Sequence, residues 1–454
     1  MERTVESLCN QLARNRLLEP NAIRAMRGRW RTEASDVADD AGRFKEWMVG
    51  NGYLTDFQLG MLTRGFGDLL FVGEYKLLDR IGQGRMAGVY KAVHPLGQVV
   101  AVKVLPPSKA QHPEIVARFQ REARMALRLK HPNVVRTFQV GKTKGDLHFL
   151  VMEFLDGETL EDVLERRKRL PLVEAIHVML QALRGLQHID EESLIHRDLK
   201  PANLMLTPAR GKDQPDTVLH QTVKILDIGL GRALFDEGTP GATDLGELTS
   251  EGALLGTPDY MAPEQARNAH LADIRSDIYG LGCILYEMLT GQPPFPDTSV
   301  VRQLVRHATQ PAKPLRELNP SLPEEVQPVI DRLLAKDPAQ RFSTPAEAAK
   351  ALKALVPQLP DAPPQPEPAP QLRSFLTWLE TNPADNGETP APAPAVSPVA
   401  ALLARPVAPT IPPELVPVSI VPMHKPFARS LPRPNRRELL FAAAGAGVLL
   451  LVEL

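Results

Sequence analysis

The chain has 454 residues and carries 53 Lys and Arg against 54 Asp and Glu, a formal net charge of −1. This length allows about two or three domains with a sizeable core. The near-neutral charge argues against a protein that mainly coats nucleic acid, so we expect no nucleic-acid partner. Cys9 and Cys283 are the only cysteines. They exclude a disulfide framework and a cysteine-based zinc site, and they fit a reducing cytoplasm.

Residues 1–72 are predicted to form a small helical region. Apolar residues recur there at helical spacing, first at Val5, Leu8 and Leu12 and then at Phe44, Trp47 and Met48. The first residues lack a basic stretch followed by an apolar run, so we expect no secretory signal. No catalytic motif is visible, and we interpret this region as a packing or partner-binding module.

Residues 75–355 begin rich in strands and continue rich in helices. Residues 99–105 (VVAVKVL) alternate with a period of two, which places Ala101, Lys103 and Leu105 on one face of a strand. A strand-rich part followed by a helix-rich part predicts an α+β domain with two lobes.

A glycine-rich segment, IGQGRMAGVY, occupies residues 81–90 between two predicted strands. Glycines at such a place let the backbone approach a phosphate chain closely. The same glycines also fit a hairpin turn that binds nothing, and both interpretations stay open on this segment alone.

Lys103 points inward on its strand and needs a partner, because burying an unpaired ammonium is costly. The helix expected after Pro113 carries an apolar stripe in which Glu122 takes the place of a hydrophobic residue. This pattern predicts a Lys103–Glu122 ion pair near a phosphate. The alternative is that Glu122 lies at the edge of the stripe and reaches solvent.

Two further motifs, HRDLKPAN at residues 196–203 and ILDIG at residues 225–229, place Asp198, Asn203 and Asp227 in loops beside strands. Carboxylate and amide oxygens are suitable ligands for Mg²⁺ that also binds phosphates. A carboxylate left free of metal can accept a proton from a hydroxyl group.

These segments, together with VAVK at 100–103, GTPDYMAPE at 256–264, DIYGLG at 277–282 and a late Arg341, occur in one order. In that order they resemble the eukaryotic-like (Hanks-type) serine/threonine protein kinases of bacteria, over about residues 75–355. The resemblance implies a bilobal α+β kinase fold with a β-rich N-lobe and a helical C-lobe. It also implies a cytoplasmic enzyme that uses ATP and Mg²⁺ to phosphorylate serine and threonine in protein substrates.

The resemblance assigns roles residue by residue. Asp198 is the expected catalytic base, Lys200 contacts the transferred phosphoryl group, and Asn203 and Asp227 hold magnesium. Glu264 pairs with Arg341 and Asp277 braces the catalytic loop, both in structural roles. The implied ATP site consists of Ile81, Gly82, Gln83, Gly84, Arg85, Met86, Ala87, Gly88, Val89, Ala101, Lys103, Glu122, Met152, Glu153 and Leu155.

Two positions depart from the family pattern. Ala87 stands where the family has the third loop glycine, with a glycine one place later, and Ile228 stands where the family has phenylalanine. Because Lys103, Asp198 and Asp227 are all retained, we expect an active enzyme. The alternative function is a pseudokinase scaffold that binds nucleotide without transferring phosphate.

The segment between Asp227 and Glu264 is predicted to regulate the enzyme. Arg197 precedes the catalytic aspartate, and a phosphate on this segment would supply an anion for it. We expect Thr249 or Ser250 to be autophosphorylated and Thr257 to act structurally near Asp198. The alternative is a polar loop without a regulatory role.

Residues 356–438 are predicted to be a disordered, proline-rich linker, since 21 of the 44 prolines lie between positions 357 and 434. Its apolar island at residues 375–379 is expected to be incidental, although it is able to dock. The linker is a candidate binder of partners with aromatic-lined grooves. Residues 439–454 are either an anchor to the inner face of the cell membrane or a short apolar helix. As a helix their apolar run spans only about 21 Å of a core about 30 Å thick.

Overall fold

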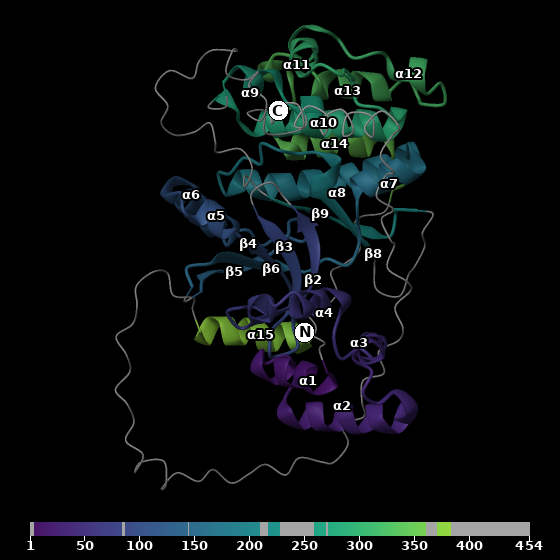
Figure 1. Cartoon of the computed structure of the whole chain (residues 1–454). Helices are drawn as coiled ribbons and strands as arrows, with labels where there is room; N and C mark the ends of the chain where they lie inside the picture. The colour runs from purple at the N-terminus through teal and green to yellow at the C-terminus, as the bar shows by residue number, and fades with distance from the viewer. Residues whose placement is uncertain are drawn as a thin grey trace, which may run out of the picture. The chain divides into compact units, whose positions relative to one another are not determined.

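An antiparallel sheet of six strands is the centre of the smaller lobe, and helices make up most of the larger one (Figure 1). The computed structural model describes residues 4–83, 87–143, 145–208, 217–227, 258–268, 271–359 and 370–382. The chain divides into two units, residues 1–389 and 390–454, and every described residue belongs to the first.

The N-terminal region is helical, as predicted. Its helices are α1 (Val5–Arg14), α2 (Pro20–Glu33), α3 (Ala41–Gly50) and α4 (Asp56–Thr63). Side chains of Thr4, Asp40 and Thr55 cap α1, α3 and α4 by accepting backbone N–H bonds. The two apolar faces expected from the sequence meet in one core, where Leu8, Leu12, Phe44 and Met48 are fully buried.

The strands of the six-stranded sheet pair in the order β1-β2-β3-β4-β6-β5, each antiparallel to its neighbour. They are β1 (Phe71–Val72), β2 (Tyr75–Gln83), β3 (Gly88–Val93), β4 (Val99–Val104), β5 (Thr137–Lys142) and β6 (His148–Glu153). The predicted alternation along β4 is confirmed, since Ala101 and Leu105 join one apolar cluster and Val100 and Val102 join another. The sheet therefore has a core on both faces.

The two faces of the sheet are covered by different helices. The inner face packs against α6 (Pro113–Ala126), which follows the short α5 (Pro107–Ala110) and contributes Phe119 and Ala123. The outer face packs against α15 (Pro370–Thr381), which contributes the fully buried Phe375. The prediction of a disordered linker over 356–438 is therefore wrong for residues 370–381. Their apolar island binds the sheet because Phe375 finds aromatic partners in Tyr75 and Phe138.

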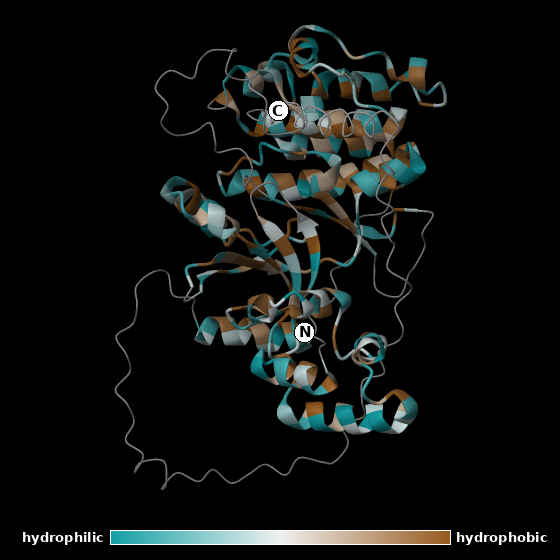
Figure 2. Cartoon of the chain, viewed as in Figure 1, coloured by the Kyte–Doolittle hydropathy of each residue, from teal (hydrophilic) through white to brown (hydrophobic). Residues whose placement is uncertain are grey.

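The larger lobe is built around α8 (Leu172–Glu191) and α10 (Ile274–Thr290), along which hydrophobic residues recur (Figure 2). Helix α10 is capped by Asp273 and ends at Gly291, whose φ of +85° suits glycine. The remaining helices are α7 (Leu160–Arg167), α9 (Pro263–Arg267), α11 (Val300–Thr309), α12 (Leu315–Leu318), α13 (Val326–Leu333) and α14 (Pro345–Leu355). A three-stranded sheet of β7 (Glu158–Thr159), β8 (Leu204–Pro208) and β9 (Gln221–Ile225) lies beside α8.

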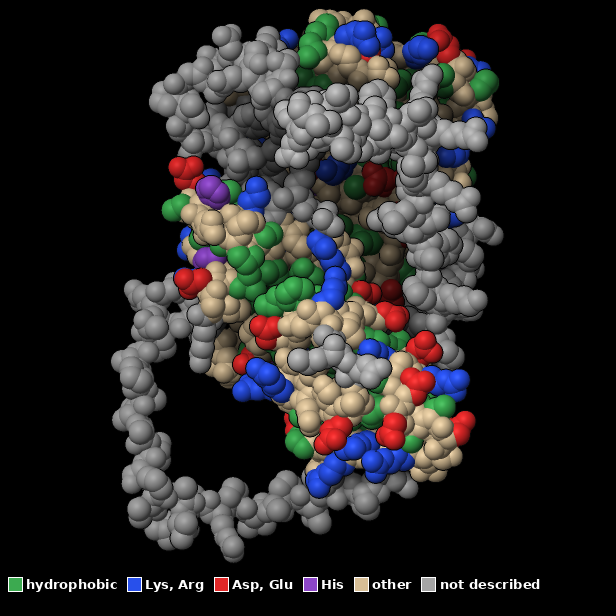
Figure 3. Space-filling view, viewed as in Figure 1, with side chains coloured by type: hydrophobic (Ala, Val, Ile, Leu, Met, Phe, Trp, Pro, Cys, Tyr) green, Lys and Arg blue, Asp and Glu red, His purple; other side chains and the backbone are tan. Residues whose placement is uncertain are grey.

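The visible face carries acidic and basic side chains of both signs intermixed (Figure 3), in keeping with the near-zero net charge. Across the part of the chain that the structure describes, no helix is both long and apolar enough to cross a bilayer. Residues 439–454 lie outside that part.

Candidate active site

The loop between α8 and β8 holds the expected catalytic residues together. The Lys200 Nζ atom lies 3.1 Å from Asp198 Oδ2. Asn203 donates from Nδ2 to the Asp198 backbone carbonyl at 2.7 Å and lies 3.3 Å from its carboxylate. Two neighbours of the same loop thus fix the orientation of the Asp198 carboxylate, the group expected to accept a proton.

A buried carboxylate on α10, Asp277, holds the backbone of this loop by hydrogen bonds. Asp277 is 2% exposed and accepts the backbone N–H bonds of His196 at 2.7 Å and Arg197 at 2.8 Å. Burial raises the pKa of Asp277, while these bonds and nearby positive charge oppose the rise. Arg197 has a φ of +64°, a strained conformation for a residue with a side chain, and Asp277 holds it there. This is the position that the bracing role requires.

His196 connects the catalytic loop to the segment that carries Asp227. Its ring is fully buried, and Nε2 lies 2.7 Å from the backbone carbonyl of Leu226. The backbone N–H of Leu226 in turn donates to the Asn203 carbonyl at 2.9 Å. His196 and Leu226 lie inside the motifs HRDLKPAN and ILDIG, but their sequence pattern alone does not indicate these contacts.

Lys103 meets Asp227 rather than Glu122. The Lys103 Nζ atom lies 2.7 Å from Asp227 Oδ1, and the structure records no Lys103–Glu122 ion pair among the residues it describes. Glu122 is 8% exposed, so the alternative in which it reaches solvent is also wrong. The predicted pair fails because the position of α6 against the sheet is set by tertiary packing, which the local sequence does not fix.

The residues of the expected adenine site form an apolar cluster. Ala101 and Met152 are buried in one cluster, and Val89, Leu155 and Leu226 pack against it. This cluster combines residues from the strand β4, the end of β6 and the segment before Asp227.

Other predicted ATP-site residues are less enclosed or lie outside the described part. Glu153 forms an ion pair of 2.9 Å with Lys224, and Ile81 is 47% exposed. Gly82 and Gly88 are paired with β3 and β2 in the ladder, and Ala87 is buried. The positions outside the described residues are the Gln83 side chain, Gly84, Arg85, Met86, Ile228, Thr249, Ser250 and Thr257.

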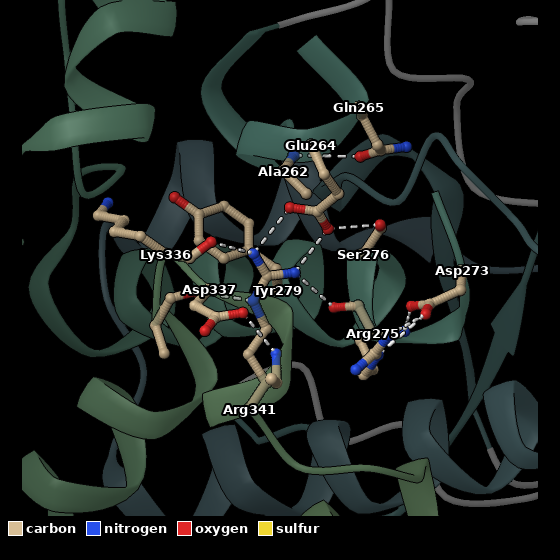
Figure 4. Close-up of polar contacts among 12 residues, drawn as sticks. Ala262, Glu264, Gln265, Asp273, Arg275, Ser276, Tyr279, Lys336, Asp337 and Arg341 are labelled. Atoms are coloured by element: carbon tan, nitrogen blue, oxygen red, sulfur yellow. Dashed lines mark hydrogen bonds and ion pairs between the residues drawn. The ribbon is translucent and has the colours of Figure 1, made fainter. Parts of the chain in front are cut away.

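The expected structural ion pair is present in the larger lobe (Figure 4). Arg341 Nη1 and Nη2 contact the two carboxylate oxygens of Glu264 at 2.7 and 2.9 Å, and Ser276 donates to the same carboxylate. Burial acts to raise the pKa of Glu264, but Arg341 and Ser276 outweigh it and the pKa is lowered. The pair fastens the segment that carries Glu264 to the helical core.

A small pocket opens beside the catalytic loop, lined by Arg197, Asp198, Tyr260, Gln265 and Gly280 among others. Gln265 donates to the Arg197 carbonyl at 3.2 Å, and the Tyr260 hydroxyl donates to Glu287 at 2.6 Å. These bonds fix two residues of the pocket wall, Gln265 and Tyr260.

Asn203 and Asp227 fit the donor set of a magnesium site. Asn203 uses its amide nitrogen on Asp198, so its amide oxygen is the atom left for a ligand. Asp227 supplies an ionised carboxylate, because Lys103 outweighs the effect of burial and lowers its pKa. One carboxylate and one amide oxygen near a phosphate site suit Mg²⁺, which keeps several waters.

Comparison with known proteins agrees with this geometry. The family model described as "Protein kinase domain" matches residues 75–354. The chain is 35% identical over 294 residues to the serine/threonine-protein kinase PknB of Mycobacterium leprae, which covers 64% of this chain and 44% of that protein. It is 34% identical over 274 residues to a probable serine/threonine-protein kinase of Clostridium perfringens, covering 60% of this chain and 37% of that protein. The chain thus spans less than half the length of these curated relatives.

A crystal structure of the Mycobacterium tuberculosis PknI kinase domain is 28% identical, with a TM-score of 0.47, and covers 63% of this chain and 98% of that one. The six-stranded sheet, the helical lobe and the loop between α8 and β8 are the parts of a kinase catalytic domain. The chain belongs to the protein kinase family. Members of this family use ATP and Mg²⁺ and act on proteins.

Proposed function

We propose that the whole chain is an ATP-dependent serine/threonine protein kinase. The observation that carries this proposal is the placement of Asp198 between Lys200 and Asn203, on a loop joined through His196 and Leu226 to Asp227. This arrangement supports the proposal because it connects the residues expected to act as the base, the cation and the metal ligands of phosphoryl transfer.

Each residue has a definite task in this reaction. Asp198 accepts the proton of the substrate hydroxyl while the hydroxyl oxygen forms a bond to the γ-phosphorus. The bond between the γ-phosphorus and the oxygen that leaves with ADP breaks. Lys200 stabilises negative charge on the transferred group, and Lys103 exchanges Asp227 for the α- and β-phosphates. Asn203 and Asp227 would hold magnesium, which neutralises phosphate charge when bound.

The test is phosphate transfer by the purified full chain with Mg²⁺, ATP and a peptide that contains serine and threonine. Asp198→Asn is expected to lower kcat by about 10²- to 10⁴-fold, the usual contribution of a general base, and to leave ADP binding intact. Asp331→Asn, on the exposed side of α13, is the matched control. Transfer that survives Asp198→Asn would contradict the proposal. ADP binding without any transfer by the natural chain would instead favour the pseudokinase scaffold.

We also propose that autophosphorylation of Thr249 or Ser250 activates the enzyme. Support comes from Arg197, whose backbone is held on one side by Asp277 and on the other by Gln265. This fixes the backbone of Arg197 next to the catalytic base, and a phosphate on the neighbouring segment would be able to pair with its guanidinium. Replacing Thr249 and Ser250 together by Ala should lower activity and remove the phosphate found by mass spectrometry, whereas Thr243→Ala should not. Unchanged activity would refute the idea.

Two expectations for the tail also stay proposals, since they rest on residues outside the described ranges. The proline-rich residues 383–438 are proposed to bind partner proteins, and deleting them should change the proteins recovered in pull-down experiments. Residues 439–454 are proposed to attach a cytoplasmic enzyme to the inner face of the membrane. Fractionation without detergent should then separate the full chain from a version ending at Arg437.

A further inference from the structure

The strand that leads into the glycine-rich loop is irregular. Pairing between β2 and β3 shifts register between Leu77 and Asp79 and again between Arg80 and Gly82. A shift of this kind interrupts the regular ladder, so backbone groups of the strand need partners from elsewhere. The second shift reaches Gly82, within the segment 81–90 that is expected to cover the phosphates.

Helix α4 of the N-terminal region lies beside β2 (Figure 1), and residues at its start supply those partners. Thr55 donates its hydroxyl to the Leu78 carbonyl at 2.5 Å, and Gln58 donates from Nε2 to the Leu77 carbonyl at 2.6 Å. The same two side chains form the capping box of α4, in which each also accepts a backbone N–H bond of the other residue. Gln58 is only 3% exposed, so its bond to the strand is shielded from water.

Phe57 lies between Thr55 and Gln58 in the sequence, and it packs against the other strand of the loop, β3. The Phe57 ring packs against the Tyr90 ring of β3, with centroids 5.9 Å apart. Tyr90 pairs with Arg80 across the ladder, and its ring lies 2.9 Å from where a Cβ on Gly88 would be. Tyr90 therefore lies directly against the last glycine of the loop. Within four residues, α4 contacts both strands from which the glycine-rich loop emerges.

We infer that Thr55, Phe57 and Gln58 are positioning residues for nucleotide binding, through which the N-terminal helices fix the base of the glycine-rich loop. Their contacts are with Leu77, Leu78 and Tyr90, none of which is among the residues assigned to the ATP site. Holding the two strands in register before ATP arrives reduces the ordering cost of binding. The inference rests on the proposed kinase function and gives residues 1–72 a role in it.

The experiment compares four variants of the full chain. Thr55→Val and Gln58→Met remove the bonds to β2 but keep side-chain volume. Thr55→Ser keeps the hydroxyl, and Asp56→Asn changes an exposed neighbour in the same helical turn. Measurements are KM for ATP, kcat, KM for the peptide, the Kd of ADP by calorimetry, and thermal unfolding without ligand.

Thr55→Val and Gln58→Met should each raise KM for ATP and the Kd of ADP by about three- to tenfold, the effect of losing a buried hydrogen bond. We expect kcat and KM for the peptide to change less than twofold, and Thr55→Ser and Asp56→Asn to match the natural chain. An unchanged KM for ATP in both folded variants overturns the inference, as does an equal rise with Asp56→Asn. If the natural chain transfers no phosphate, the proposed function fails, whereas the Kd of ADP still tests the positioning role.

Discussion

Lys103 and Asp227 form a direct ion pair, with Nζ 2.7 Å from Oδ1. The pair joins the lysine expected to bind phosphates to the carboxylate expected to bind magnesium. Both groups therefore have to exchange this bond for contacts with ATP and its metal. In protein kinases the lysine is paired with the glutamate of the neighbouring helix in the active state. The pair seen here differs from that arrangement, because Lys103 contacts Asp227.

The first prediction concerns this lysine. Lys103→Met should lower kcat/KM for ATP by about 10²- to 10³-fold, since a preorganised charge on the phosphates is lost. It should also raise the pKa of Asp227, because burial already acts to raise that pKa and Lys103 is the main group that opposes it. Lys109→Met, in the exposed α5, serves as the control. A Lys103→Met enzyme that retains a tenth of the natural activity would contradict this role.

The buried Arg341–Glu264 pair should matter far more for stability than a surface pair. Arg341→Met leaves the buried Glu264 carboxylate uncompensated, which should lower the free energy of unfolding by about 3–5 kcal/mol. Arg316→Met removes one partner of an exposed pair with Glu324 and should cost at most about 1 kcal/mol. Urea denaturation of both variants measures the contrast, and similar losses would show that the buried pair has no special structural role.

The stability of the larger lobe should decline in acid through His307. This ring is fully buried, bonded to the Tyr279 hydroxyl at 2.8 Å, and burial followed by the charge of Lys336 lowers its pKa to about 3. Unfolded histidine takes up a proton near its ordinary pKa of 6.5. The contribution of neutral His307 to the free energy of unfolding is therefore complete above pH 6.5. It is lost as the pH falls toward 3, by up to about 1.4 kcal/mol per pH unit.

Urea unfolding at pH 7 and pH 5 tests this dependence. His307→Gln should weaken the loss of stability between the two values. His112→Gln changes an exposed histidine before α6 and should leave the loss as it is in the natural chain. An identical pH dependence in all three proteins would rule out His307 as its source.

Helix α15 should stabilise the smaller lobe. Phe375 is fully buried among Tyr75, His94 and Phe138. Phe375→Ala should therefore cost about 3–5 kcal/mol, as for other large core residues. Thr377→Ala, on the exposed side of the same helix, should change stability by less than about 0.5 kcal/mol. Hydrogen exchange localises the effect, because faster exchange is expected in the six-stranded sheet, and unaltered exchange there would show that α15 adds nothing to it.

The parts predicted well from sequence are those with a strong local pattern. The period of two over residues 99–105 is enough to place Ala101 and Val102 on opposite faces of β4. The catalytic loop was also foreseen, since its residues are close in sequence and its motif is specific. Asp198 and Asn203 are five positions apart, so a short loop brings them together.

The parts missed depend on contacts between distant residues. The sequence of the apolar cluster at residues 375–379 does not indicate that Tyr75 is its partner. The prolines around the cluster favour disorder. The role of Gln58 was hidden for the same reason, because its partner is a backbone carbonyl of another element. Whether Lys103 pairs with Asp227 or Glu122 depends on the position of α6 relative to the sheet. The spacing of residues within α6 does not determine that position.

The covering of the outer face of the sheet has a practical consequence for producing this protein. A fragment cut at the family boundaries, residues 75–354, would lack both β1 and α15. Strand β2 would become an unprotected edge, and the apolar side chains of Val100, Val102 and Phe149 would meet water. Open strand edges beside apolar surface promote aggregation. We therefore expect a catalytic fragment that does not aggregate to extend from residue 4 to residue 382.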